Sequence, residues 1–188
     1  MSTYVAMLRG INVSGHNLIK MEALRALFEA CGFANVRTYI QSGNVVFTAR
    51  AGAAACVTAI EKALARELRK PIAVALRTAQ ELGSIIRANP FAREKDADES
   101  KFAVTFLQAP PNKARLDALA GVQSGRDRFA ARGKEIYLYL PDGFGRSKLA
   151  AGLERILSLP GTSRNWNTVK KLHEISITNV VGQAQLAR

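Results

Sequence analysis

The chain has 188 residues, of which 48% are hydrophobic, and its 27 lysines and arginines against 15 aspartates and glutamates give a formal net charge of +12. This apolar content suffices for a packed core and excludes a disordered or fibrous chain. Two cysteines without metal-ligand spacing and two histidines far apart in the sequence cannot build a zinc site, so we expect no metal and no cofactor.

The first 77 residues predict one small α+β unit. In chain order we expect a strand at 3–8, a polar turn at 9–17, a helix at 21–30, two strands at 36–40 and 45–48, a helix ending before Pro71, and a strand at 72–76. This β-α-β-β-α-β order is the split ferredoxin-like pattern. Because its first and third strands are neighbours, the turns at 9–17 and 41–44 are expected to lie near each other.

Residues 78–101 predict a connection between two units. Leu82, Ile85 and Ile86 mark a short helix that ends at Asn89-Pro90, and residues 93–101 are almost all charged, as in a solvated linker.

Residues 102–160 repeat the pattern as far as β-α-β-β-α. The strands are expected at 102–107, 126–130 and 135–140, and the helices around Leu116 and around Leu149 to Leu157. We therefore predict an internal structural duplication. A C-terminal helix capped by Asn167 and a tail fill residues 161–188. The fold class is α+β: two ferredoxin-like subdomains with antiparallel sheets, plus a C-terminal helix.

Each such sheet carries helices on one face only, so its other face must be covered, form a homodimer, or offer a stacking platform for bases. The aromatic residues on these strands are Tyr4, Phe47, Phe102, Phe106, Tyr137 and Tyr139. Packing into the core is the alternative use for all six.

Two glycine-containing turns suggest anion binding. Gly10 to Gly15 has the G-x4-G frame of a phosphate loop, but His16-Asn17 replaces the usual Lys-Ser/Thr, which argues against a nucleoside triphosphatase. Gly143 to Lys148 opens a helix with a serine and two cations, where either an anion or an ordinary Ser147 cap fits. No nucleophile–base pair and no paired carboxylates stand out in these turns.

The positive charge is scattered, although residues 111–171 hold 12 basic and five acidic residues and thus carry a net +7. Nucleic acid is one explanation of this excess, and solubility is the other. The N-terminus lacks the features of a signal peptide and uncharged runs are too short to span a bilayer, so we expect a cytoplasmic protein with no membrane contact.

Four segments carry a family resemblance: Leu8 to Gly15, Arg37 to Phe47, Ile136 to Gly143 and Arg164 to Val169. Together they resemble the bacterial domain of unknown function 1697. The resemblance implies an α+β protein of two ferredoxin-like subdomains and no established activity. This chain has Ser14 where the family usually has Gly, and His16 where it usually has Lys.

Our leading hypothesis is a polar anion-binding site whose ligand is a nucleic acid or a phosphorylated small molecule. Its candidate residues are Arg9, Asn12, Asn17, Lys20, Ser42, Asn44, Arg146, Ser147, Lys148, Arg164, Asn165 and Asn167. The alternatives are an enzyme acting on a phosphorylated or carboxylated metabolite and a structural module that dimerises through its sheet.

Overall fold

A computed structural model describes residues 1–94, 98–122 and 125–186. The chain divides into two compact units, one formed by Met1–Ser84 with Lys171–Arg188 and the other by Ile85–Lys170. Across the described residues, no helix combines the length and the apolar character that crossing a membrane requires.

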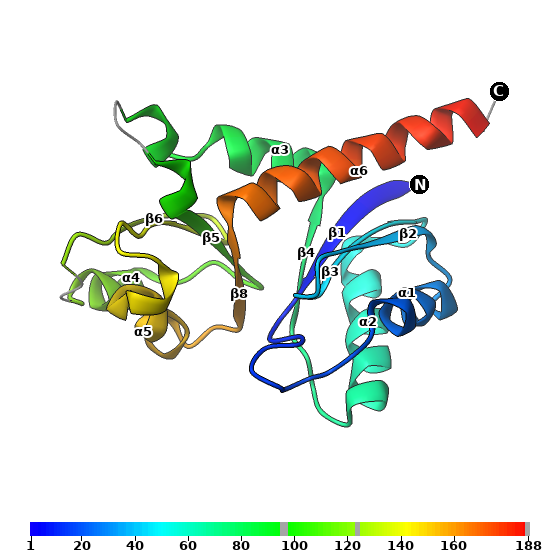
Figure 1. Cartoon of the computed structure of the whole chain (residues 1–188), viewed down its shortest axis with the longest axis horizontal. Helices are drawn as coiled ribbons and strands as arrows, with labels where there is room; N and C mark the ends of the chain where they lie inside the picture. Colours follow the sequence, from blue (N-terminus) through cyan, green and yellow to red (C-terminus); the bar gives the residue numbers. More distant parts are fainter. Residues whose placement is uncertain (95–97, 123–124, 187–188) are drawn as a thin grey trace. The chain divides into compact units, whose positions relative to one another are not determined.

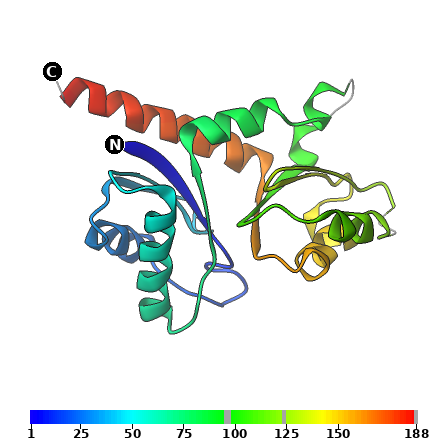
Figure 2. The same cartoon turned by 180° about the vertical axis from the view of Figure 1, so that it is seen from behind.

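The first unit has the predicted β-α-β-β-α-β order. Its elements are β1 (Ser2–Leu8), α1 (Met21–Ala30), β2 (Ala34–Tyr39), β3 (Asn44–Ala49), α2 (Ala53–Leu68) and β4 (Val74–Thr78). All pairings are antiparallel and the strand order is β2-β3-β1-β4, which is ferredoxin-like. Figures 1 and 2 show α1 and α2 on the same side of this sheet.

Helical spacing explains how this unit closes its core. Leu24 and Phe28 on α1, and Ile60 and Leu64 on α2, are completely buried against the sheet. Gly32, which has φ +82°, ends α1 as predicted. Both faces of β1 are buried from Thr3 to Leu8, so this strand has an apolar run rather than an alternation.

Both cysteines are free thiols that pack beside this core. Cys56 is buried and Cys31 is half-buried, and burial raises the pKa of each thiol. The two thiols are not joined by a disulfide.

The second unit repeats the topology of the first. After α3 (Ala79–Arg87), which starts in the first unit, its elements are η1 (Phe91–Arg93), η2 (Glu99–Lys101), β5 (Phe102–Leu107), α4 (Lys113–Ala120), β6 (Arg128–Arg132), β7 (Glu135–Tyr139), η3 (Phe144–Arg146), α5 (Lys148–Leu157) and β8 (Gly161–Asn165). The last helix, α6 (Trp166–Leu186), starts in this unit and belongs to the first unit from Lys171 onward. The strand order β6-β7-β5-β8 matches that of the first sheet, which confirms the duplication.

Strand β8 is absent from the sequence-based prediction, which had only β-α-β-β-α here. It pairs antiparallel with β5, from Ala103 opposite Asn165 to Leu107 opposite Gly161. The strand was missed because its residues are polar and show no apolar alternation. Gly161 provides the close fit, since a Cβ there would lie 2.8 Å from Leu107 Cδ2.

The start of α6 also differs from the prediction. The helix begins at Trp166, and the cap is Asn165, whose Oδ1 accepts a hydrogen bond of 2.8 Å from the Thr168 N–H. Asn167 was wrongly predicted as the cap because β8 was not recognised. The helix runs on to Leu186, so the segment expected as a tail is helical to that residue.

The charged segment before β5 is partly ordered by an ion pair. Glu94 receives two hydrogen bonds from Arg128, of 2.9 and 2.6 Å, and the Arg128 guanidinium carbon lies 4.7 Å from the centre of the Tyr139 ring. Residues 95–97 of the predicted linker lie outside the described residues.

The aromatic residues considered for base stacking belong to the core. Their exposed fractions are 5% or less for Tyr4, Phe47, Phe102, Phe106 and Tyr137. The Tyr137 hydroxyl donates a 2.9 Å hydrogen bond to the Ile85 carbonyl, and Arg128 covers the Tyr139 ring. The core-packing interpretation is therefore confirmed for the five buried rings.

Candidate anion-binding pocket

The turns at 9–17 and 41–44 of the first unit lie against each other, as expected from its topology. The Asn12 amide donates to the carbonyls of Ile19 (3.0 Å) and Gln41 (2.9 Å), and its oxygen accepts from the Ile19 N–H (2.9 Å). The Leu8 N–H also donates a 2.8 Å backbone hydrogen bond to the Gly43 carbonyl. Asn12 thus connects the 9–20 loop to the β2–β3 turn.

Gly43 makes this close approach feasible. Its φ is +73°, and a Cβ there would lie 2.8 Å from Ile11 Cβ and 3.0 Å from Leu8 Cβ. Beside it, the buried Asn44 amide donates to the Tyr39 carbonyl (3.2 Å) and to the Ser42 hydroxyl (3.0 Å). These two turns are therefore built around one glycine and two asparagines.

The six candidates in this unit divide into structural amides and surface groups. Asn17 donates a 2.8 Å hydrogen bond to the Gly10 carbonyl, so Asn12, Asn17 and Asn44 all hold turns in place. Arg9 and Lys20 are exposed cations on the same loop. Their binding of an anion stays a prediction.

The other six candidates lie in the second unit. Ser147 is buried and caps α5 by accepting a 2.8 Å hydrogen bond from the Ala150 N–H, as in the capping alternative, whereas its binding of an anion stays a prediction. Arg146, Lys148 and Asn167 are exposed. The remaining two candidates, Arg164 and Asn165, line a pocket.

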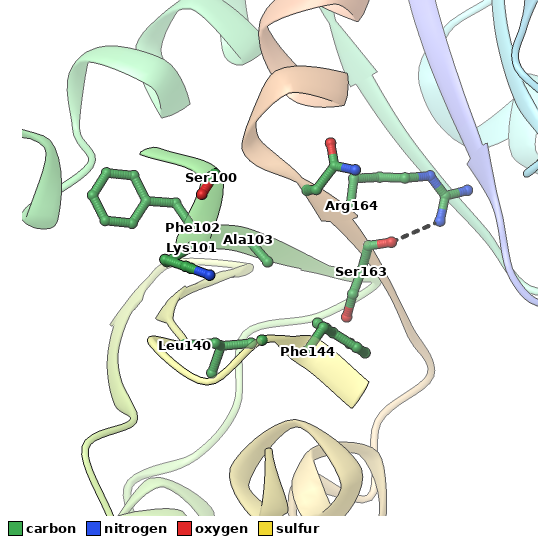
Figure 3. A pocket seen from close by; sticks show the side chains of 10 residues that line it. Ser100, Lys101, Phe102, Ala103, Leu140, Phe144, Ser163 and Arg164 are labelled. Atoms are coloured by element: carbon green, nitrogen blue, oxygen red, sulfur yellow. Dashed lines mark hydrogen bonds between the residues drawn. The ribbon is translucent and has the colours of Figure 1, made fainter. Parts of the chain in front are cut away.

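This pocket has a volume of about 240 Å³ and lies where β5, β8 and the β7–η3 turn come together. Its lining residues are Ser100, Lys101, Phe102, Ala103, Leu140, Gly143, Phe144, Ser163, Arg164 and Asn165. Figure 3 shows Lys101 and Ser163 on opposite sides, with Leu140 and Phe144 along one wall between them.

Lys101 is the cation directed at the pocket. Figure 3 shows its ammonium pointing into the space bordered by Ala103 and Leu140. The side chain is half-buried, and within the described part of the chain it makes no ion pair. A buried stem with a charged end facing a cavity is well suited to hold an anionic group.

One carboxylate lies near this lysine without lining the pocket. The pKa of Asp98 is lowered by hydrogen bonds from the Ser100 side chain and backbone, and then by the charge of Lys101. Asp98 therefore competes with a bound anion for the attraction of Lys101.

Arg164 contributes differently. Figure 3 shows its guanidinium directed away from Leu140 and Phe144, and Nη1 donates to the Thr162 hydroxyl (2.6 Å) and the Ser163 carbonyl (2.9 Å). Burial lowers the pKa of this guanidinium to about 10. Its role at the pocket is to fix the backbone of β8.

Two polar side chains complete the rim on β8. The Ser163 hydroxyl is 2.7 Å from the Thr105 hydroxyl, which orients it beside the cavity. Asn165 uses its oxygen to cap α6, and its NH₂ group makes no hydrogen bond with any other described residue. That amide is a donor suited to an anion.

The described lining residues do not include a carboxylate, a histidine or a cysteine. Among these lining residues, Lys101 is the side chain of an acid–base type that faces the cavity.

The prediction from sequence missed Lys101 and Phe144 as pocket residues. Lys101 ended a segment interpreted as solvated linker, whereas its backbone carbonyl accepts from the Leu140 N–H at 2.9 Å. Phe144 lies within the Gly143 to Lys148 motif, so that motif was the sequence feature that could have indicated Phe144 as a pocket residue.

The fold and the pocket define an α+β protein of two ferredoxin-like units with a small polar pocket in the second. The chain belongs to the DUF1697 family, described as proteins of unknown function, whose model matches residues 1–137. A conserved bacterial protein of known structure, SP0830 from Streptococcus pneumoniae, is similar in fold: the TM-score is 0.74 at 20% identity, over 94% of this chain and 98% of that one. A comparison with curated proteins finds no match.

Proposed function

We propose that this protein binds a small phosphorylated molecule in the pocket of its second unit. The observation that carries the proposal is the Lys101 ammonium, which points into a cavity whose described lining residues include no carboxylate. Asn165 and Ser163 belong to the same lining, and the amide of the first and the hydroxyl of the second can donate to the remaining phosphate oxygens.

Binding without catalysis is the form that the lining supports. An enzyme acting on the same ligand needs an acid or base beside it. Lys101 is the one described lining side chain of the usual acid–base types, and the proposal assigns its charge to holding the anion.

Nucleic acid, the other ligand expected from the sequence, has weaker support. Single-stranded recognition relies on exposed aromatic rings, and the five rings named above are buried. Scattered cations such as Arg146 and Lys148 would give only binding that weakens steeply with salt.

The test is a titration of the ¹⁵N-labelled protein with methyl phosphate, followed by amide chemical shifts. We expect saturable shifts at residues 100–103, 143–144 and 163–165. Lys101→Met removes a charge-assisted contact and should weaken binding about tenfold. Asp98→Asn keeps the oxygen that accepts from Ser100 but removes the competing charge, so it should tighten binding about twofold.

The two variants are matched, because they change the charge beside the pocket in opposite directions. Absence of saturable shifts, or equal binding by the wild type and Lys101→Met, would overturn the proposal. An oligonucleotide that shifts the same amides at lower concentration than methyl phosphate would overturn its small-molecule form.

A further inference from the structure

One aromatic residue of the second unit stands apart from the others. Phe91, Phe102, Tyr139 and Trp166 pack ring against ring, with centroid separations of 5.6 to 6.3 Å. Phe144 lines the pocket, is 50% exposed, and has no ring partner in the described part of the chain. It is also the only exposed large apolar side chain in the described residues of this unit.

The backbone beneath Phe144 is held in place. Gly143, with φ +90°, donates 2.9 Å to the Leu140 carbonyl, and the Phe144 carbonyl accepts 3.3 Å from the Ser147 N–H just before α5 begins. The ring is therefore presented beside the cavity by a fixed turn. A side chain presented in this way loses little conformational freedom when a ligand packs on it.

The pocket combines polar and apolar surface. Lys101 and Ser163 lie on opposite sides of it, and Ala103, Leu140 and Phe144 provide apolar surface between them. Its volume of about 240 Å³ is small beside the range of roughly 300–1,000 Å³ usual for drug-sized ligands. A single ring with one anionic group suits this space better than a dinucleotide or a polymer.

From these features we infer that the ligand carries its anionic group on a planar aromatic ring, which packs against Phe144 while the anion meets Lys101. This inference rests on the proposed function and specifies its ligand class. Aromatic rings gain from offset or edge-to-face contact beyond the area that they bury, whereas a saturated ring of equal size gains only the area.

The experiment compares phenyl phosphate with cyclohexyl phosphate, which has the same charge and a similar volume but no aromatic face. The wild-type protein should bind phenyl phosphate about fivefold more tightly. Phe144→Leu keeps an apolar side chain. Because residue 144 is half exposed, the variant protein should keep its fold. In this variant phenyl phosphate and cyclohexyl phosphate should bind equally tightly.

The outcomes separate the inference from the proposed function. If the wild type binds both ring esters equally, or if the preference persists in Phe144→Leu, the aromatic ligand class is wrong while phosphate binding stands. If neither the ring esters nor methyl phosphate binds, or if Lys101→Met binds them unchanged, both proposals are wrong.

Discussion

Arg77 and Arg164 occupy the same position in the two sheets. Each is the fourth residue of its unit's last strand, and each lies opposite a valine of the first strand, Val5 or Val104. Both are buried, and each donates from Nη1 to the carbonyl of the preceding residue, at 2.8 Å for Arg77 and 2.9 Å for Arg164. The duplication therefore extends from strand order to strand register and to this arginine hydrogen bond.

Substitution of Gly43 should test the tight contact between the two turns of the first unit. Gly43→Ala places a Cβ 2.8 Å from Ile11 Cβ at a φ of +73°, so we expect a loss of about 3 kcal/mol in the free energy of unfolding. Gly15→Ala is the matched control, since its φ is +77° but nothing lies within 4 Å. It should cost about 1 kcal/mol.

Urea titrations of both variants measure this difference. If Gly15→Ala is as destabilising as Gly43→Ala, the effect comes from backbone conformation alone and the packing argument is wrong.

Asn12 is predicted to be structural rather than part of the phosphate-binding pocket. Asn12→Gly allows the φ of +54° but removes three hydrogen bonds, so we expect a loss of about 2 kcal/mol in the free energy of unfolding. Asn12→Asp keeps the accepting oxygen, so its free energy of unfolding should lie between those of the wild type and Asn12→Gly. Methyl phosphate should still shift residues 100–103 in both variants, and loss of that shift would place Asn12 in the binding site.

Tyr137 should make stability depend on alkaline pH. Burial, with Glu135 adding to it, raises the pKa of Tyr137 to about 12 from its ordinary 10.0. Since the folded-state pKa lies above the unfolded one, the neutral phenol stabilises the fold fully below pH 10, and this contribution is lost as the pH rises toward 12.

Tyr137→Phe measures that contribution. At pH 8 the variant leaves the Ile85 carbonyl without its donor and should lose about 1–2 kcal/mol in the free energy of unfolding. Between pH 10 and 12 the wild type should lose stability more steeply than the variant. Parallel pH profiles would contradict the pKa assignment.

The ion pair between Arg128 and Glu94 should respond to acid. Hydrogen bonds from Arg128 lower the pKa of Glu94, so the pair stabilises the fold above the ordinary carboxyl pKa and this is lost as the pH falls through the lowered value. Arg128→Gln should lower the thermal midpoint at pH 7 and have little effect at pH 3.

Arg126→Gln is the control for this pair. Arg126 contacts Asp142 at 2.6 Å but is more exposed, with 73% of its side chain accessible against 46% for Arg128, and it has no recorded aromatic partner in the described structure. Its substitution should change the midpoint less. An equal effect of the two variants would show that stacking on Tyr139 adds nothing.

Most of the fold follows from periodicity, and the exceptions have physical causes. Leu24, Phe28, Ile60 and Leu64 recur at helical spacing because only one face of each helix meets the sheet. Strand β8 was not predicted because hydroxyl side chains, a glycine and an arginine occupy its buried positions, where an apolar pattern is expected. The duplication could have predicted this strand. In the first unit β4 follows α2, so the repeat predicts a strand after α5.

The pocket was less predictable than the fold. The candidates Arg164 and Asn165 do line it, but Lys101 and Phe144, which also line it, are 43 residues apart in sequence. Such a convergence depends on which strands pair, and a single sequence encodes that only indirectly. Short sequence motifs were enough to predict the helix caps and turns, whereas the cavity could be located only from the tertiary structure.

Asn165 gives the pocket a built-in reporter. The same residue is the last of β8 and the cap of α6, with its oxygen accepting from the Thr168 N–H, and it also lines the cavity while its amide NH₂ group remains the donor of the side chain. An occupant that hydrogen-bonds to this amide would restrain the cap, and the Thr168 amide would then exchange its hydrogen with solvent more slowly. The exchange rate of one backbone hydrogen can thus signal whether the cavity is filled, even before its ligand is identified.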